Sequence, residues 1–280
     1  MGKRISYTQV SMFTQCPHRW KTNYVDRISK REGSIHLIFG TAMHEVLQNY
    51  FTIMYEHSVK AADAFDSETF LYNRLVETFK KDKETSEVFE VTQEEMVEFY
   101  NDGLAILDFF KKRRGEYFSK RGYELIGCEV PVDLDLPNNL KWIGYLDLVI
   151  KDTIHDVIKI YDIKTSTMGW NKWMKMDKGK TDQLLYYKQF YSKMYNHPIF
   201  IVKRKLYEKV DFPQKRIQKF APASGKPSIN KAMGNLKVFV NAAFTEDGEY
   251  IEGKSQPTNP SKKNCKWCEF KNTEYCSDGI

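Results

Sequence analysis

Two short stretches of sequence decide the fold: residues 142–150, which read WIGYLDLVI, and residues 160–164, which read IYDIK. Both have the apolar and β-branched content of strands, and each holds a single carboxylate among apolar neighbours. A charge buried in a strand costs free energy unless it is paired or bound to a cation. The two acidic residues, Asp147 and Asp162, therefore need a partner, and this makes them the first candidate functional residues.

A turn centred near Ile154 and His155 would set Asp147 and Asp162 opposite each other. Lys164 shares the face of Asp162, because side chains two apart in a strand point the same way. Two facing carboxylates beside an ammonium favour Mg²⁺ or Mn²⁺, which prefer oxygen ligands. Such a cation would lower the pKa of a bound water and stabilise charge on a phosphate, while Lys164 orients or deprotonates the nucleophile. The alternative is an edge-strand salt bridge.

The strands lie between helical segments. Ser6 and Gln9 are read as a capping box for the first helix, which Pro17 interrupts or restarts. A second helix carries an apolar stripe over residues 43–51, and residues 58–118 read as further helices. Three consecutive strands then predict an antiparallel meander. The rest of the chain is predicted to hold a helix capped by Thr181 and Asp182, a short strand at 199–202, a helix at 228–244 and an irregular tail from Gly253.

The composition fits a globular, intracellular protein. The chain has 280 residues, of which 41% are hydrophobic and 14% aromatic, enough for a substantial core. No apolar run long enough to span a membrane and no signal peptide is present. The net charge of +6, from 43 basic and 37 acidic residues, only weakly favours a nucleic-acid partner.

Three of the five cysteines lie close together in the tail, as Cys265, Cys268 and Cys276. In a tail with little apolar periodicity, such a group predicts a metal that folds the segment. Three thiolates leave one ligand position open. Cys16, Cys128 and any histidine are candidates for it, and a Cys₃His zinc site is the generic interpretation.

The acidic hairpin resembles the core of the PD-(D/E)XK nucleases, with the G-x-x-D motif from Gly144 to Asp147 and the D-x-K motif from Asp162 to Lys164. The segment 39–44, which reads FGTAMH, is similar to a motif of the RecB-like branch. The histidine of that motif, a metal ligand in the branch, corresponds to His44.

A second RecB-like motif, Q-x-x-x-Y, matches Gln183 and Tyr187. Four residues apart on a helix, both side chains can face the active site. Taken alone, the pair also fits an ordinary amphipathic helix.

The resemblance also implies the nature of the cysteine site. RecB-like nucleases of the helicase–nuclease and CRISPR-associated exonuclease groups carry one cysteine before the histidine motif and three after the core, which bind a 4Fe-4S cluster. Cys16, Cys265, Cys268 and Cys276 match this order, and four thiolates suit such a cluster. Zinc is the alternative metal. Cys128 is then a small buried hydrophobe.

The fold implied is α/β: a restriction-endonuclease-like core with a mixed central sheet flanked by helices, and terminal segments joined by the metal cluster. One nuclease domain spans 1–280. It comprises a helical part (1–122) with Cys16 and His44, a catalytic core (123–207), and a C-terminal helix with the cysteine-bearing tail (208–280).

The function implied is metal-dependent hydrolysis of DNA phosphodiesters, by an exonuclease of recombination, repair or phage DNA metabolism. His44, Asp147 and Asp162 bind Mg²⁺ or Mn²⁺, the Ile163 carbonyl is a further candidate ligand, and Lys164 assists the attacking water. The partners expected are DNA and a separate helicase or recombination protein. The rival hypothesis is a non-catalytic or zinc-stabilised DNA-binding subunit of a larger nuclease complex.

Two weaker candidates remain. Glu129, on the first strand, is placed to reach the metal through water, but it reads equally as a solvated surface carboxylate. Trp170 and Trp173, interleaved with lysines, form a segment that would stack on bases near the active site. The same tryptophans would equally serve to cover the core.

Overall fold

A computed structural model of the chain describes residues 2–166, 175–195, 199–207 and 217–280. The described helices are α1 (Tyr7–Gln15), α2 (Pro17–Tyr24), α3 (Ile35–Glu56), α4 (Val59–Ala64), α5 (Ser67–Thr85), α6 (Gln93–Arg113), α8 (Lys178–Thr181), α9 (Gln183–Tyr195), α10 (Lys226–Ala243) and α11 (Lys262–Cys265). The described strands are β1 (Arg4–Ile5), β2 (Tyr123–Leu136), β3 (Leu140–Asp152), β4 (Val157–Ser166), β5 (Ile199–Tyr207) and β6 (Ile217–Phe220). The helices and strands predicted from the sequence are confirmed, apart from shifts at their ends. Thr181 does not cap α9 as predicted, because it lies in α8 and its hydroxyl donates to the Asp177 carbonyl.

The strands form one mixed sheet. β2, β3 and β4 make the predicted antiparallel meander. One edge of β3 pairs with β2, while the other pairs first with β1, in parallel, and further along with β4. β5 joins β4 in parallel, and β6 adds to β5 in the antiparallel sense. A mixed sheet with helices on it confirms the predicted α/β class. The short strands β1 and β6 were not predicted, because neither is long enough to show alternation.

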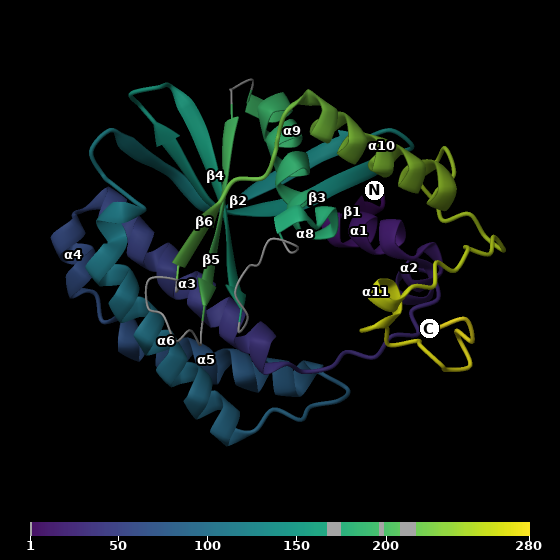
Figure 1. The fold of residues 1–280 in the computed structure, drawn as a ribbon, viewed down its shortest axis with the longest axis horizontal. Helices are drawn as coiled ribbons and strands as arrows, with labels where there is room; N and C mark the ends of the chain where they lie inside the picture. Colours follow the sequence, from purple (N-terminus) through teal and green to yellow (C-terminus); the bar gives the residue numbers. More distant parts are fainter. Residues whose placement is uncertain (1, 167–174, 196–198, 208–216) are drawn as a thin grey trace.

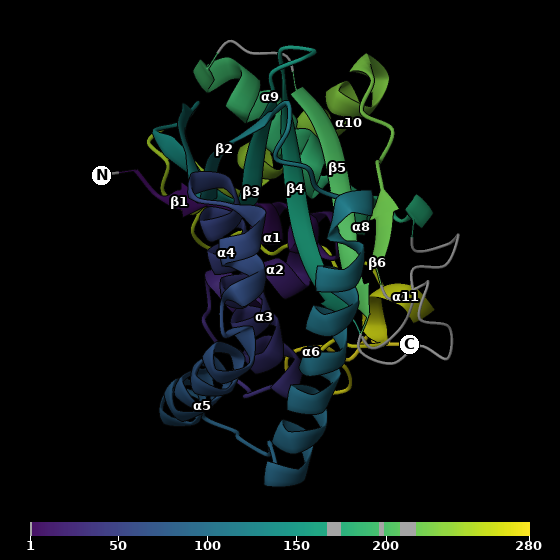
Figure 2. The ribbon, with the colours of Figure 1, turned by 90° about the vertical axis from the view of Figure 1, so that its left-hand side faces the viewer.

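Helices cover both faces of the sheet, so the protein has two apolar cores (Figures 1 and 2). On one face, α3 packs over Leu148 and Ile150, with α5 and α6 beyond it. On the other, α9, α10, α1 and α2 pack with Trp142 and Leu146. The stripe predicted at residues 43–51 of α3 is buried in the first of these cores.

In the central strands β2 and β3, the alternation of side chains between the two faces of the sheet breaks at one position. Leu146 belongs to the core under α9 and Leu148 to the core under α3, although side chains two apart in a regular strand share a face. β2 does the same, since Cys128 packs toward the α3 core and Val130 toward the α9 core. Between them Glu129 has φ 48°, a left-handed conformation that few non-glycine residues adopt. The sheet is therefore irregular where Glu129 lies.

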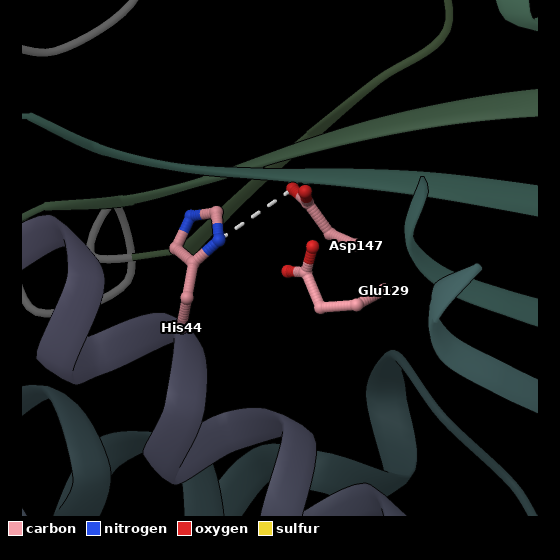
Figure 3. Close-up of side chains that lie close together, drawn as sticks. All are labelled: His44, Glu129 and Asp147. Carbon is pink, nitrogen blue, oxygen red and sulfur yellow. Dashed lines mark ion pairs between the residues drawn. The ribbon is translucent and has the colours of Figure 1, made fainter. Parts of the chain in front are cut away.

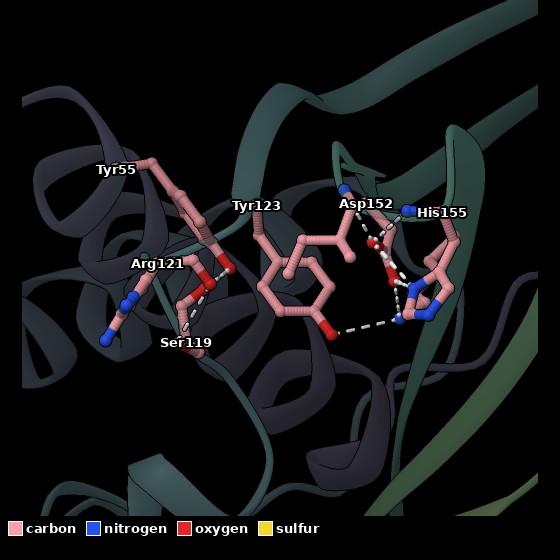
Figure 4. A network of polar contacts seen from close by, with 8 residues as sticks. Tyr55, Ser119, Arg121, Tyr123, Asp152 and His155 are labelled. Atoms are coloured by element: carbon pink, nitrogen blue, oxygen red, sulfur yellow. Dashed lines mark hydrogen bonds and ion pairs between the residues drawn. The ribbon is translucent and has the colours of Figure 1, made fainter.

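Asp152 anchors the turn between β3 and β4 (Figure 4). This side chain is buried, and its carboxylate accepts the backbone N–H groups of Ile154 and His155 at 3.1 Å each. The Lys159 ammonium lies 2.7 Å from the other oxygen and also donates to the Tyr123 hydroxyl. The hydrogen bond from Lys159 holds the pKa of Asp152 below its usual range, in spite of burial. The anchor fixes the turn where the sequence predicted it, and so fixes the strand register.

Replacing this anchor should alter stability in a pH-dependent way. Since the folded state lowers the pKa of Asp152, the charged carboxylate stabilises the protein above the unfolded pKa of about 4, and this stabilisation is lost as the pH falls through the lower folded value. We expect Asp152→Asn to lower the melting temperature at pH 7 by several degrees, with a smaller difference from wild type near pH 3. Asp135→Asn, at an exposed position of β2, is the control and should change little. A difference that is independent of pH would contradict the assignment.

Two local predictions about helix starts have different outcomes. Pro17 begins α2, with Cys16 as the N-cap, so the predicted restart is confirmed. The capping box at Ser6 and Gln9 is wrong: the Ser6 side chain makes no capping hydrogen bond, and the Gln9 amide donates instead to the Arg4 carbonyl of β1. Gln9 thus ties α1 to the sheet.

Among the described residues, no helix combines the length and the apolar character needed to cross a bilayer.

Candidate active site

The candidate site forms where β3 and β4 separate. Their ladder ends at the pair Leu148 and Tyr161, and the next pair in the same register is Asp147 opposite Asp162. There, Asp147 Oδ2 accepts the backbone N–H of Ile163 at 2.6 Å, so its side chain takes the place of a strand-to-strand hydrogen bond. This contact turns the Asp147 carboxylate toward β4.

Two further ligand-type side chains approach Asp147 from α3 and β2 (Figure 3). His44 Nδ1 lies 3.8 Å from Asp147 Oδ2. Glu129 stands opposite Asp147 in the β2–β3 register, which pairs Cys128 with Leu148 and Val130 with Leu146. One potential ligand atom from each of His44, Glu129 and Asp147 lies within 4.8 Å of the other two. The sequence interpretation ranked Glu129 below the others, whereas the structure brings it into this group.

Asp162 and Lys164 lie beside this group, but Asp162, a predicted metal ligand, is not one of the three residues whose ligand atoms lie within 4.8 Å of one another. Asp162 is only 2% exposed, and its Oδ1 lies 2.7 Å from Lys164 Nζ. Burial by itself would lower the pKa of Lys164, but the Asp162 and Asp147 carboxylates outweigh it, so the pKa is raised. Lys164 is thus a cation held between two acidic side chains. The predicted D-x-K pair is an ion pair in the structure.

The electrostatics of Asp147 fit a divalent cation. Burial, and then the nearby charge of Asp162, raise the pKa of Asp147 to about 6, although Lys164, His44 and the Ile163 N–H act against this shift. A cation among these groups would relieve the repulsion. Carboxylate oxygens with one imidazole nitrogen form a donor set that suits Mg²⁺ or Mn²⁺. The residues present therefore fit such an ion.

Gln183 and Tyr187 lie in the first two turns of α9, on the other face of the sheet. The Gln183 amide donates to the Tyr187 hydroxyl at 2.9 Å, so the Q-x-x-x-Y pair is joined by a hydrogen bond. Burial raises the pKa of Tyr187, and Asp162 and Lys164 are among the charges that act on it. The pair therefore lies beside the acidic residues.

Gly144 leaves room for the Tyr187 ring. A Cβ atom at position 144 would lie 2.8 Å from Tyr187 Cε1. Because Tyr187 is buried, its ring has little space into which it could shift. The glycine of G-x-x-D is thus explained by the close approach of a side chain from α9.

This contact gives a test of the Tyr187 position. We expect Gly144→Ala to displace the ring and to reduce kcat of the reaction at this site by about 10- to 100-fold, the size of effect that a small misplacement produces. Gly234→Ala, in α10, is the control, because an added Cβ there meets no atom within 4 Å. Wild-type kcat in Gly144→Ala would show that the Tyr187 position is unimportant for the reaction.

The cysteine-bearing tail lies against α1 and α2 (Figure 1). Asn264 donates to the Gln15 carbonyl at 2.9 Å, Arg19 Nε donates to Glu269 at 2.8 Å, and His18 Nε2 is 2.8 Å from the Tyr275 carbonyl. These contacts bring the residues next to Cys16 against those next to Cys265, Cys268 and Cys276.

None of the five cysteines, all within the described part of the chain, forms a disulfide, and the 4Fe-4S cluster stays a prediction. Burial, and to a smaller extent Glu269 and Cys16, raise the pKa of Cys268, which indicates that Cys16 and Cys268 are near each other. Cys128 lies elsewhere, on β2, where burial raises the pKa of its thiol to about 11. This position agrees with its interpretation as a small hydrophobe.

Trp170 and Trp173 lie outside the described residues.

Acidic side chains that can hold a divalent cation, with a lysine and a histidine close by, can support hydrolysis of a phosphodiester. The sequence model of the PD-(D/E)XK nuclease superfamily matches residues 4–273, and the chain belongs to that superfamily.

The fold has a counterpart among solved structures. A crystal structure from Eubacterium rectale, described as that of a "Putative exonuclease", is similar with a TM-score of 0.51 and 14% sequence identity, over 84% of this chain and 78% of the other. At this identity the likeness shows the fold. A comparison with curated proteins gave no match.

Proposed function

We propose that this protein is a divalent-metal-dependent deoxyribonuclease that hydrolyses phosphodiester bonds, and that it acts as an exonuclease. One observation carries the proposal: Asp147, Asp162 and Lys164 meet at the open end of the β3–β4 ladder, with His44 of α3 beside them. The membership of a nuclease superfamily supports the reaction class. The exonuclease assignment draws support from the description of the Eubacterium rectale protein.

The residue roles follow from the chemistry of each group. His44, Asp147 and Asp162 would hold Mg²⁺ or Mn²⁺, with the Ile163 carbonyl as a further ligand. When bound, the cation supplies an activated water and stabilises negative charge on the phosphate. Lys164, held by Asp162 at 2.7 Å and kept charged by its raised pKa, orients the attacking water and stabilises negative charge, and it does not accept the proton of that water.

Gln183 and Tyr187 complete the site from α9. Their mutual hydrogen bond fixes the Tyr187 hydroxyl near Asp162 and Lys164. We propose that they position the substrate or the lysine, because neither group is a strong acid or base at neutral pH.

The proposal is tested by incubating the protein with end-labelled linear DNA and with covalently closed circular DNA, each with Mn²⁺, Mg²⁺ or EDTA. We expect nucleotides to be released from the labelled ends with either metal, no release in EDTA, and intact circles. Cleavage of the circles would establish an endonuclease instead. If neither DNA is cut with either metal, the protein is a non-catalytic subunit and the proposal fails.

We further propose that Cys16, Cys265, Cys268 and Cys276 bind a 4Fe-4S cluster. The contacts of Gln15, His18 and Arg19 with the tail support it, because they bring the two cysteine-bearing segments together. The corresponding cellular role would lie in recombination, repair or phage DNA metabolism, beside a separate helicase or recombination protein.

A further inference from the structure

Glu129 is an exposed member of the acidic group and needs a restraint to stay there. Its potential ligand oxygen lies within 4.8 Å of those of His44 and Asp147, while the residue itself is exposed. A glutamate has several rotatable bonds, and repulsion from Asp147 would turn a free carboxylate toward solvent. The left-handed backbone at φ 48° fixes the direction in which the Glu129 side chain leaves the backbone, but it does not fix the position of the carboxylate.

The restraint is Gln48. Its amide Nε2 lies 2.5 Å from Glu129 Oε1 and 3.5 Å from the backbone carbonyl of Asp147. Gln48 is four residues after His44 on α3, so both side chains project from the same face of the helix. One turn of α3 thus offers a ligand to the site, and the next turn holds a neighbouring carboxylate in place.

The helix and strand that carry this contact are themselves joined. The Cys128 thiol approaches the Gln48 backbone carbonyl at 3.7 Å, and the Thr52 hydroxyl lies 3.9 Å from the same sulfur. These contacts lie beside Glu129 in sequence but do not touch its carboxylate. Gln48 therefore acts from a fixed position.

The chemistry of an amide suits this task. A neutral N–H₂ donor can bind one carboxylate oxygen without cancelling its charge, so the other oxygen keeps its full capacity for a cation. A lysine or arginine would neutralise Glu129, and a second glutamate would repel it. Gln48 thus orients the carboxylate and leaves the negative charge of the site intact.

We propose that Gln48 is a positioning residue that holds Glu129 as an additional ligand of the divalent cation. The inference rests on the proposed metal-dependent function and deepens it. It predicts that Gln48 sets the affinity for the metal through Glu129, rather than through the stability of the fold.

The test measures Mn²⁺ binding directly, by electron paramagnetic resonance of free Mn²⁺ and by calorimetry, with no DNA present. We expect Gln48→Ala to weaken Mn²⁺ binding by about 10-fold or more, the usual effect of losing a group that orients a ligand. Glu129→Ala should weaken binding at least as much. In the Glu129→Ala background, Gln48→Ala should add almost nothing.

Two further variants keep the outcome clear. Gln48→Met preserves the length of the side chain without the donor, and it replaces Gln48→Ala if the latter unfolds. Thr52→Val, one turn further along α3, alters the contact with Cys128 alone and should bind Mn²⁺ as the wild type does.

The possible failures are distinguishable. If the wild type binds no Mn²⁺, the proposed metal-dependent function fails. If the wild type binds and the Gln48 variants bind equally well, the role of Gln48 is refuted. It is also refuted if Gln48→Ala weakens binding to the same extent with Glu129 already removed, since Gln48 would then act by another route.

Discussion

Asp162→Asn and Lys164→Ala should each reduce kcat on DNA by about 100- to 1000-fold, which is the range found when one group that stabilises developing charge is removed. Asp162→Asn keeps the shape of the side chain but removes a buried negative charge 2.7 Å from Lys164. Lys164→Ala removes the ammonium group that we propose acts on the attacking water. Initial rates with saturating Mn²⁺, together with melting temperatures, measure the two effects.

The chain contains a matched control for this prediction. Asp133 on β2 and Lys141 on β3 form an ion pair at 3.1 Å in the same sheet, and the Asp133 side chain is 49% exposed, whereas that of Asp162 is 2% exposed. Asp133→Asn should therefore leave kcat unchanged. Wild-type turnover in Asp162→Asn would mean that Asp162 and Lys164 form an ordinary salt bridge, as Asp133 and Lys141 do.

Loss of Cys16 or Cys276 should remove the brown colour expected of a bound iron–sulfur cluster and should loosen both ends of the chain. Protein purified without oxygen is expected to be brown and to hold about four iron atoms per chain, as a thiolate-bound cluster requires. Cys16→Ser and Cys276→Ser should each lose the colour. Both should become protease-sensitive near the C-terminus, because the tail has few apolar contacts of its own and the cluster would fold it.

Cys128→Ser is the control for the cluster. Cys128 lies on β2, away from the tail, so this variant should keep both the colour and the resistance to protease. Stoichiometric zinc without iron in anaerobically purified protein would overturn the cofactor assignment. The nuclease proposal would still stand, because the two sites share no ligand.

Much of the fold follows from the sequence because the decisive signals are local. The turn near Ile154 and His155 is symmetric about the two aspartates, and the structure has the register that this symmetry predicts. The same reasoning would have identified Glu129. A Pro-Asn-Asn turn centred on Asn138 sets Glu129 opposite Asp147, and the β2–β3 ladder has this register.

The sequence could not reveal the break in side-chain alternation in β2 and β3. Strict alternation assigns Leu146 and Leu148 to one face, whereas they lie in different cores. Local pattern likewise gave no sign of β1, whose pairing depends on β3 more than a hundred residues later. The Gln48 contact also depends on tertiary structure, since nothing in the sequence links position 48 to position 129.

The two cores have a consequence for when the protein can act. His44 and Gln48 come from a helix of one core, and Tyr187 and Gln183 from a helix of the other. The acidic residues lie between them, so the site exists only when both halves have folded. A partly folded chain, on the ribosome or after local melting, would lack one wall of the site. The proposed nuclease would therefore be active only in a chain in which both cores have formed.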